Sequence, residues 1–393
     1  MKIEKFKKEP IVELNASFVP SKNFYRTNDK DNWFEELKRY YLNTATLSSI
    51  VDFKHKTMIG EGLTADNDID KLKLSNINFN IESEDKGPNI NEILWNFFFD
   101  FSLYGVGALH IEYNAERTNI LKINYIDPTK LRISYLNKYN YELKTFWFKT
   151  NWIDCENQSK YIFNKEVKEF QRFGIPGTET EQVLYFHDTP LSLGIYPIPW
   201  YRGAFKSVKT EMNIMDYYEN LSSNGFMGNI LLNFNDGDPG DEQKIETMQE
   251  LQKFLGPNAQ SLAMVQFNSN GQNAATIEKF NTEAEDTKFL NLIQEYKANI
   301  ISKGACSPAL VGLEIPGKLG DRNTIEEQYE KFLNTEIKTI REKFLKIWNK
   351  EINPLLLEPL STDAYFENMT LFTTEKPTNN NEFVVKYKKE IDE

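Results

Sequence analysis

The sequence predicts an α+β protein assembled from more than one structural unit. Segments with the apolar spacing of helices flank a run of short segments that are rich in Ile, Tyr, Phe and Trp. The chain has 393 residues, and at about 150 residues per domain this length suggests two or three units. Hydrophobic residues make up 40% of the chain. That is enough to build real cores, so wholesale disorder is excluded.

The charge balance and the few cysteines and histidines exclude several classes of protein. Lysine and arginine number 46 against 58 acids, a net charge of −12, and such a chain lacks the clustered cations that tight duplex binding needs. Two cysteines, Cys155 and Cys306, exclude a disulfide framework, and three separated histidines form no HExxH motif. The basic N-terminus is not followed by the apolar run of a signal peptide. No apolar stretch in the sequence is long enough to span a membrane. We therefore expect a soluble, intracellular chain with no metal and no other cofactor.

The first hundred residues combine an extended arm with two helices. Residues 1–30 carry seven cations against four acids, and they fit either a solvated tail or an arm that docks on a neighbouring subunit. Asp31 is expected to cap the next helix, because its carboxylate can accept from the first free amides. Gly60 closes that helical region. A second helix over 91–104 is expected to end at Gly105.

A change of period then marks a sheet. Five segments are rich in β-formers and are separated by turn residues. Together with the preceding helices they make one α+β unit over 31–199. The five predicted strands are 108–113, 120–126, 131–136, 142–149 and 183–187.

Two long helices follow, over 200–224 and 283–303. Apolar residues recur every three or four positions in both. Such faces need partners that bury them, and copies arranged in a closed ring would supply those partners. The residues that we expect between subunits are Phe205, Val208, Met212, Met215, Phe289, Ile293 and Tyr296.

The insert between these helices, 226–281, is small and acidic. We expect a strand over 229–234, a helix over 241–254 and a strand over 261–267. The turn DGDPGD at 236–241 is similar to a calcium loop in composition, but its glycine does not have the spacing of such a loop. A solvated acidic turn is the simpler interpretation.

A glycine-rich loop, 311–323, precedes a third long helix. Thr324 and Glu327 have the spacing of a capping box, in which two side chains satisfy amides at each other's position. The apolar stripe continues over 325–352 and stops before Pro354. The tail beyond Lys376 is polar, and we expect it to be mobile.

No group of residues has the pattern of a catalytic centre. The chain lacks a GxxxxGK[ST] phosphate-binding loop. Cys306 has no histidine close in sequence that would activate it, so we expect a buried, inert thiol. His187 lies in a strand-like run and is expected to be structural. The sequence therefore predicts a protein that is not an enzyme.

Long stretches of the chain resemble, in order, the bacteriophage portal proteins, the head-to-tail connector superfamily of tailed phages. The likeness covers about residues 30–360. The segments that carry it are FDFSLYGVGALHIEYN, LKINYIDPTKLRI, VLYFHDTPLSLGIYPIPWYRGAFKSVKTEMNIMDYYENLSSNGFMGNILL, TEAEDTKFLNLIQEYKANIISKGACSPALVGL and EEQYEKFLNTEIKTIREKFLKIWNKEINPLL.

The resemblance implies the portal fold, with an α/β wing, a two-helix stem, a strand-helix-strand clip and a long helix after a tunnel loop. The short C-terminus departs from the family, because it leaves little chain for a large helical crown, and the size of the crown stays open. The implied units are an N-terminal arm (1–30), the first part of the wing (31–199), stem helix 1 (200–225), the clip (226–281), stem helix 2 (282–304), a tunnel-loop region (305–323), a wing and crown part (324–375) and a C-terminal tail (376–393).

The resemblance also implies a function. A portal ring, of twelve copies in this family, sits at one capsid vertex of the virion, initiates capsid assembly in the host cytoplasm and is the channel for genome packaging and ejection. The implied partners are further copies of the chain, double-stranded DNA, the terminase large subunit, the head–tail adaptor, the major capsid protein and the scaffold, with no membrane. The clip residues expected to bind terminase and then the adaptor are Asp236, Asp238, Asp241, Glu242 and Glu246. The residues expected to line the channel are Glu314, Lys318, Leu319 and Arg322.

Two alternatives stay open. One is another structural protein of a phage head or neck, although such proteins are usually shorter and lack a helix–insert–helix unit. The other is a DNA-processing enzyme such as a nuclease, which would need a carboxylate or histidine cluster that holds Mg²⁺. A metal-dependent nuclease assay separates the enzyme from the structural proteins.

Overall fold

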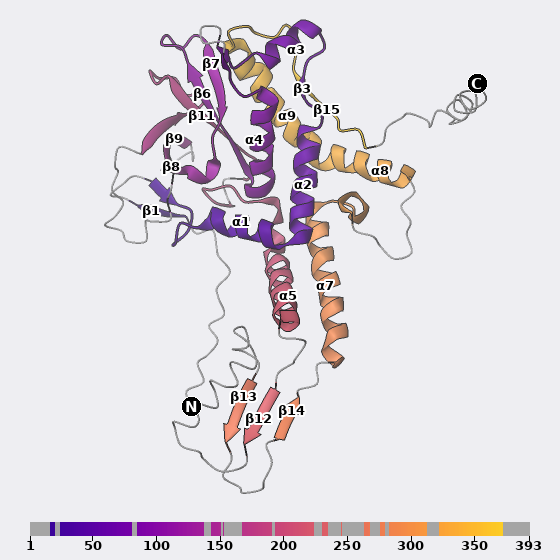
Figure 1. The fold of residues 1–393 in the computed structure, drawn as a ribbon. Coiled ribbons are helices and arrows are strands. Elements are labelled where there is room, and N and C mark those ends of the chain that lie inside the picture. Colours follow the sequence, from indigo (N-terminus) through magenta and orange to yellow (C-terminus); the bar gives the residue numbers. More distant parts are fainter. Residues whose placement is uncertain are drawn as a thin grey trace, which may run out of the picture.

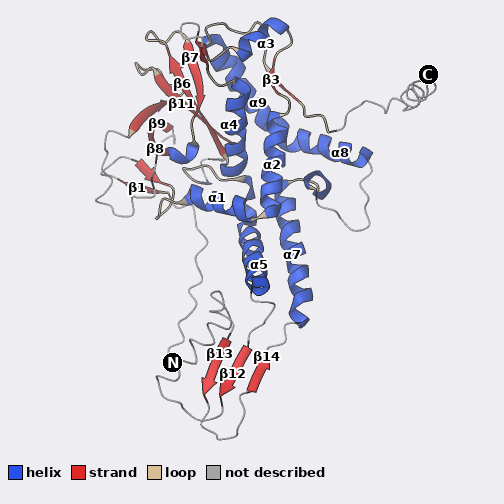
Figure 2. Ribbon diagram, in the orientation of Figure 1, coloured by secondary structure: helices blue, strands red, loops and turns tan. Residues whose placement is uncertain are grey.

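The computed structural model describes residues 16–19, 24–80, 85–136, 143–150, 152, 167–190, 193–223, 230–234, 245, 263–267, 276–279, 283–312 and 322–371. An α/β upper body stands above two long helices that descend side by side, and a small sheet lies at their lower end (Figures 1 and 2). Helices and sheets together confirm the predicted α+β class. None of the described helices is long and apolar enough to cross a membrane.

Three helices occupy the centre of the upper body: α1 (Trp33–Asn43), α2 (Ala45–Ile59) and α4 (Ile90–Tyr104). The helical region expected after Asp31 is divided in two, because Thr44 has extended backbone angles (φ −130°, ψ 105°). Helix α4 ends at Gly105, as predicted. The φ of 79° at this residue is the left-handed conformation that glycine adopts without strain.

The prediction that Asp31 caps the first helix is wrong. Asn32 occupies the N-cap position, while Asp31 has a φ of 55°. The Asp31 carboxylate accepts from the backbone N–H of Thr27 and from Nε of Arg132, each at 2.9 Å. Both members of the ion pair are buried, and a charge-assisted bond to a guanidinium is stronger than one to a neutral helix amide. The pair therefore ties the start of the body to the sheet.

A six-stranded sheet stands beside α4 in the order β7–β6–β11–β10–β9–β8. Neighbours pair antiparallel, except that β10 and β11 pair parallel. Five strands confirm the predicted ones. The sixth, β10, gave no signal because its sequence KEFQR contains one apolar residue. The strands are β6 (Val106–Tyr113), β7 (Ile120–Tyr125), β8 (Leu131–Leu136), β9 (Leu143–Phe148), β10 (Lys168–Arg172) and β11 (Glu181–His187).

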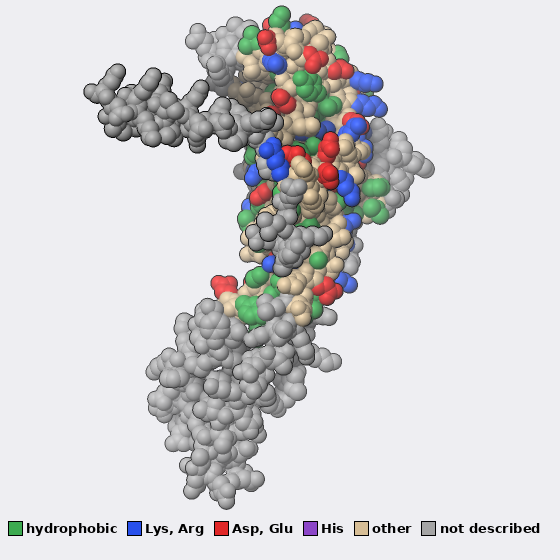
Figure 3. All heavy atoms as spheres, turned by 90° about the vertical axis from the view of Figure 1, so that its right-hand side faces the viewer, with side chains coloured by type: hydrophobic (Ala, Val, Ile, Leu, Met, Phe, Trp, Pro, Cys, Tyr) green, Lys and Arg blue, Asp and Glu red, His purple; other side chains and the backbone are tan. Residues whose placement is uncertain are grey.

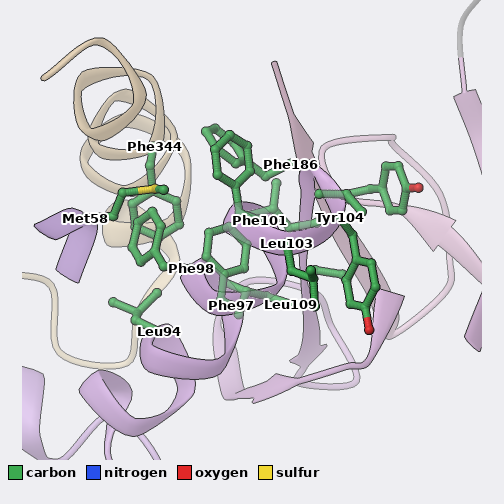
Figure 4. Packing of buried hydrophobic residues seen from close by; sticks show 14 of the residues in the cluster. Met58, Leu94, Phe97, Phe98, Phe101, Leu103, Tyr104, Leu109, Phe186 and Phe344 are labelled. Carbon is green, nitrogen blue, oxygen red and sulfur yellow. The ribbon is translucent and has the colours of Figure 1, made fainter. Parts of the chain in front are cut away.

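The core of the upper body lies between α4, the sheet and a C-terminal helix, α9 (Lys338–Ile347). Figure 4 shows Phe97 and Phe98 of α4 close to Phe344 of α9 and Phe186 of β11. The ring centroids of Phe98 and Phe344 are 5.4 Å apart, and those of Phe97 and Phe186 are 5.8 Å apart. Residues from distant parts of the sequence thus close one apolar core.

The helix expected over 325–352 is interrupted. It consists of α8 (Arg322–Phe332), a π-helical turn (Leu333–Ile337), α9 and a second π-helical turn (Trp348–Ile352). Helix α8 points away from the upper body, at a steep angle to α9 (Figure 1), and π-helical turns are a known cause of such kinks. Because α8 begins before Thr324, that residue lies inside the first turn and the predicted capping box is wrong.

The remaining described elements are short. In the lower sheet, β12 pairs parallel with β13 and antiparallel with β14, which confirms the two strands predicted for the insert and adds a third. The helix expected over 241–254 lies outside the described residues except for Ile245. The short elements are β1 (Ser17–Val19), β2 (Phe24–Arg26), β3 (Gly62–Thr64), α3 (Asp68–Ser75), β4 (Phe79–Asn80), β5 (Asp85–Lys86), β12 (Ile230–Phe234), β13 (Ala263–Phe267), β14 (Thr276–Lys279) and β15 (Tyr365–Glu367).

Candidate functional site

Two helices, α5 (Phe205–Ser223) and α7 (Glu283–Gly304), form a stem between the upper body and the lower sheet (Figure 1). They contain 19 and 22 residues, so at 1.5 Å per residue they are about 28 and 33 Å long. Both helices were predicted from their apolar spacing. A 3₁₀ turn (Trp200–Ala204) takes the place of the first residues of the expected first helix.

The upper end of α5 is covered by the chain's own aromatic residues. The ring of Phe205 lies 5.6 Å from Trp33 and 5.5 Å from Tyr40, measured between centroids. Val208 and Met212 are buried in the same core. Phe205, Val208 and Met212 were expected between subunits, but their burial leaves them no free surface for a neighbouring copy.

Exposed apolar surface lies farther down the stem. Met215 on α5 is 42% exposed and Leu292 on α7 is 37% exposed. Ile293 is buried and Tyr296 is half-buried, while the side chain of Phe289 is outside the described residues. The exposed apolar surface of the stem therefore lies in its lower half.

A buried carboxylate joins the stem to the upper body. The Thr46 hydroxyl, in the first turn of α2, donates to Oε1 of Glu211 on α5 at 2.8 Å. Glu211 is 1% exposed, and its second oxygen has no partner among the described residues. Burial raises the pKa of the Glu211 carboxyl, against the effects of the Thr46 hydrogen bonds and of Lys297 on α7. The contact places a carboxylate at the N-terminus of α2, where the helix dipole favours negative charge.

A buried lysine forms the second link at this junction. Nζ of Lys54 on α2 is 3.0 Å from the carboxylate of Glu336, which lies in the π-helical turn. The same ammonium is 4.8 Å from the centre of the Trp200 ring. Burial lowers the pKa of Lys54, while Glu336 opposes that effect. The lysine thus connects the upper body, the top of the stem and the kink before α9.

The surface is hollowed beside these links. A cleft of about 760 Å³ lies between α2, the end of α4, the 3₁₀ turn, the top of α7 and the π-helical turn. Apolar side chains such as Met58 and Phe101 form part of its wall. Its charged lining consists of Lys54, Asp188, Arg202, Lys303 and Glu336.

The two links between stem and upper body, Thr46–Glu211 and Lys54–Glu336, could not be predicted from the sequence. Lys54 and Glu336 are 282 positions apart, and Thr46 and Glu211 are 165 apart. Neither pair has a local spacing that a pattern search detects. The one available signal was that Lys54 and Glu336 each lie on the apolar side of a predicted helix, where a charged side chain needs a partner.

Of the predicted clip and channel residues, all but Arg322 lie outside the described part of the chain. Arg322 is described, and its Nε donates to Glu326 at 2.9 Å on the surface of α8. The predicted residues outside the description are Asp236, Asp238, Asp241, Glu242, Glu246, Glu314, Lys318 and Leu319.

The cysteine and histidine singled out in the sequence occupy structural positions. Cys306 is buried, and burial raises the pKa of its thiol to about 12, which keeps it protonated and unreactive. His187 is the last residue of β11. Within the described ranges, no group of three or more His, Cys, Asp or Glu side chains is placed to hold a metal ion.

Comparison by sequence gives no relative. No protein-family model matches the chain, and no curated protein sequence matches it.

Comparison by structure does give matches. A chain in the virion of the native gene transfer agent particle has a TM-score of 0.52 at 9% identity, and the match covers 91% of this chain and 89% of that chain. A chain in the neck of the empty particle, computed with C6 symmetry, has a TM-score of 0.52 at 8% identity, with the same coverage. A chain in the neck of the native particle, computed with C12 symmetry, has a TM-score of 0.52 at 10% identity and covers 96% of this chain and 91% of that chain. The protein therefore shares its fold, over most of its length, with chains of gene transfer agent particles.

Proposed function

We propose that this protein is a portal: a structural protein that forms a ring at one vertex of a phage-type capsid and conducts DNA in and out. The observation that carries the proposal is the fold shared with chains in the necks of gene transfer agent particles, which in one match spans 96% of the chain. The ordered sequence segments that resemble portal proteins support the same conclusion.

In this proposal each part of the structure has a role. The upper body (31–199 with 324–375) is the wing, α5 and α7 are the stem, and the insert 226–281 is the clip. The clip docks the terminase during packaging and the head–tail adaptor afterwards. The region 305–323 faces the channel, and the ring initiates capsid assembly with scaffold and major capsid protein.

The exposed apolar residues of the lower stem favour a ring. Met215 and Leu292 lie on two helices that project from the upper body (Figure 1), and in a ring the stem of the next copy covers them. A closed ring satisfies every copy in the same way. The C12 symmetry of one matched neck supports twelve subunits.

The charge of the chain suits a conduit. Each phosphate contact adds affinity and salt dependence, so a channel that passes DNA benefits from few free cations. The net charge is −12, and Arg322, at the start of α8, is paired with Glu326. In this proposal DNA moves past paired charges without being held.

Electron microscopy of the purified protein tests the proposal. Top views of the wild-type protein should show an annulus with a central hole. The double variant Met215→Asp/Leu292→Asp should lose the ring, since each aspartate would be buried between stems. Leu357→Asp is the matched control, because Leu357 is 60% exposed and lies outside the stem. A wild-type protein that remains a monomer at high concentration contradicts the portal assignment.

A further inference from the structure

The cleft at the junction of upper body and stem carries excess positive charge in an acidic chain. Its two carboxylates are already engaged, one by Lys54 and the other by a lysine of α9. Two further cations, Arg202 and Lys303, line the same cleft. Neither forms an ion pair with a described residue. The cleft therefore offers two unneutralised cations to an anion.

Arg202 is held by two aromatic rings. Its guanidinium carbon is 5.5 Å from the centre of the Trp33 ring and 5.1 Å from that of Phe205. Nη1 is buried and has no hydrogen-bond partner among the described residues. A buried donor without an acceptor costs free energy. The planar guanidinium matches a carboxylate with two parallel hydrogen bonds.

Lys303 lies on the rim of the same cleft. A Cβ added to Gly203 would be 3.4 Å from Cε of Lys303, so the lysine stem crosses the 3₁₀ turn next to Arg202. Burial is the main cause that lowers the pKa of Lys54, and the charge of Lys303 acts in the same direction. Lys303 therefore lies beside the turn that carries Arg202, within electrostatic reach of Lys54.

A projecting helix carries the matching negative charge. Helix α8 points away from the upper body (Figure 1), on the side where Figure 3 shows acidic and basic side chains interspersed. Glu327 and Glu330 on α8 are exposed, and neither pairs with a cation in the described part of the chain. Glu326, in contrast, is held by Arg322.

The cleft and α8 are joined through the π-helical turn. The π-helical turn that directly follows α8 contributes Glu336 to the cleft, and α8 runs across the direction of α5 and α7 (Figure 1). Rotation about a ring axis parallel to the stem moves a copy sideways without changing its height. A projecting α8 is therefore available to a neighbouring copy in a ring.

We propose that the cleft receives α8 of a second copy, with Arg202 and Lys303 binding the carboxylates of Glu327 and Glu330. This inference rests on the proposed ring and names a contact that holds its subunits together. Charge complementarity identifies the occupant, because the cleft has two cations without an ion pair among the described residues and α8 projects two exposed carboxylates.

Charge reversal tests the contact. The fraction of assembled rings is measured by mass photometry over a range of protein and salt concentrations for wild type, Arg202→Glu and Lys303→Glu. Loss of a close interfacial charge pair should lower the association constant about tenfold or more. Lys303 is exposed, so Lys303→Glu tests the cleft even where Arg202→Glu fails to fold. Lys346→Glu, an exposed position of α9 outside the cleft, is the control.

Compensation tests the occupant. Combining Lys303→Glu with Glu327→Arg and Glu330→Arg should restore the rings that the single change loses. Wild-type assembly in both Arg202→Glu and Lys303→Glu overturns the inference and leaves the proposed ring intact. Rings that are lost in the single variants and not restored by the combination overturn the assignment of α8. Absence of rings in the wild-type protein overturns the proposed function itself.

Discussion

Neutralising Glu336 should destabilise the protein more than replacing its partner Lys54. Their charged atoms are 3.0 Å apart, but the side chains are 33% and 4% exposed, respectively. In Glu336→Gln a buried ammonium loses its carboxylate, whereas in Lys54→Met a partly exposed carboxylate regains water. We expect a loss of about 2 kcal/mol for Glu336→Gln and a change below about 1 kcal/mol for Lys54→Met, because a buried unpaired charge is the costlier defect.

The pH dependence separates this effect from a loss of packing. Burial already lowers the pKa of Lys54, and Glu336 opposes that lowering, so the pKa falls further in Glu336→Gln. A base whose pKa is lower in the folded state binds more protons when unfolded, and stability then rises with pH over that interval. The deficit of Glu336→Gln relative to wild type should shrink from about pH 7 to about pH 10, where free lysine begins to lose its proton.

Thermal unfolding at several pH values, followed by both tryptophan fluorescence and circular dichroism, measures the deficit. Two probes are needed because a chain with several units need not unfold in one transition. Glu342→Gln, at an exposed carboxylate of α9, is the matched control and should behave as wild type. Equal losses in Glu336→Gln and Lys54→Met, or a deficit that is constant with pH, would refute the reasoning.

Three further changes test other parts of the structure. Phe344→Ala removes a fully buried ring between α4 and α9 and should cost about 3–5 kcal/mol in chemical denaturation, with Phe344→Leu losing less. Glu211→Ala leaves the start of α2 without its hydrogen-bonded carboxylate and should cost about 1–2 kcal/mol, seen as faster hydrogen exchange in the first turn of α2. Burial acts to raise the pKa of Asp70, but hydrogen bonds, foremost from Ser361, hold it well below its ordinary value. Its stabilisation is therefore present above the unfolded pKa of about 4 and lost as pH falls, so Asp70→Asn should flatten the acid limb of a stability–pH curve.

The sequence predicted those elements that local rules specify. Helix α4 ends at Gly105 because a left-handed residue stops a helix wherever it occurs. The stem helices follow from apolar period, and five of the six strands of the large sheet follow from β-forming residues separated by turns. Strand β10 was missed because its residues, KEFQR, have little β-forming character. Its place in the sheet depends on the hydrogen bonds that it forms with β9 and β11.

Local rules failed where a distant residue competes for the same group, or where a helix begins before the residue that has the pattern of its cap. Asp31 has the chemistry of a helix cap, yet Arg132 takes its carboxylate. Thr324 and Glu327 have the spacing of a capping box, but the helix extends past them to Arg322. The junction around Glu336 was out of reach for the same reason, since its partner lies on another helix at the far end of the chain.

The aromatic core of the upper body also constrains when a subunit finishes folding. Phe97 and Phe98 leave the ribosome early, but Phe344, which packs on both, emerges only after the whole helical pair and the sheet below it have been made. Contacts between such distant positions form slowly, and until they do the part of α4 that packs on α9 is uncovered. Synthesis of everything between α4 and α9 thus precedes closure of this core. Chaperones that shield nascent apolar surface are consequently most needed while that part of the chain is being made.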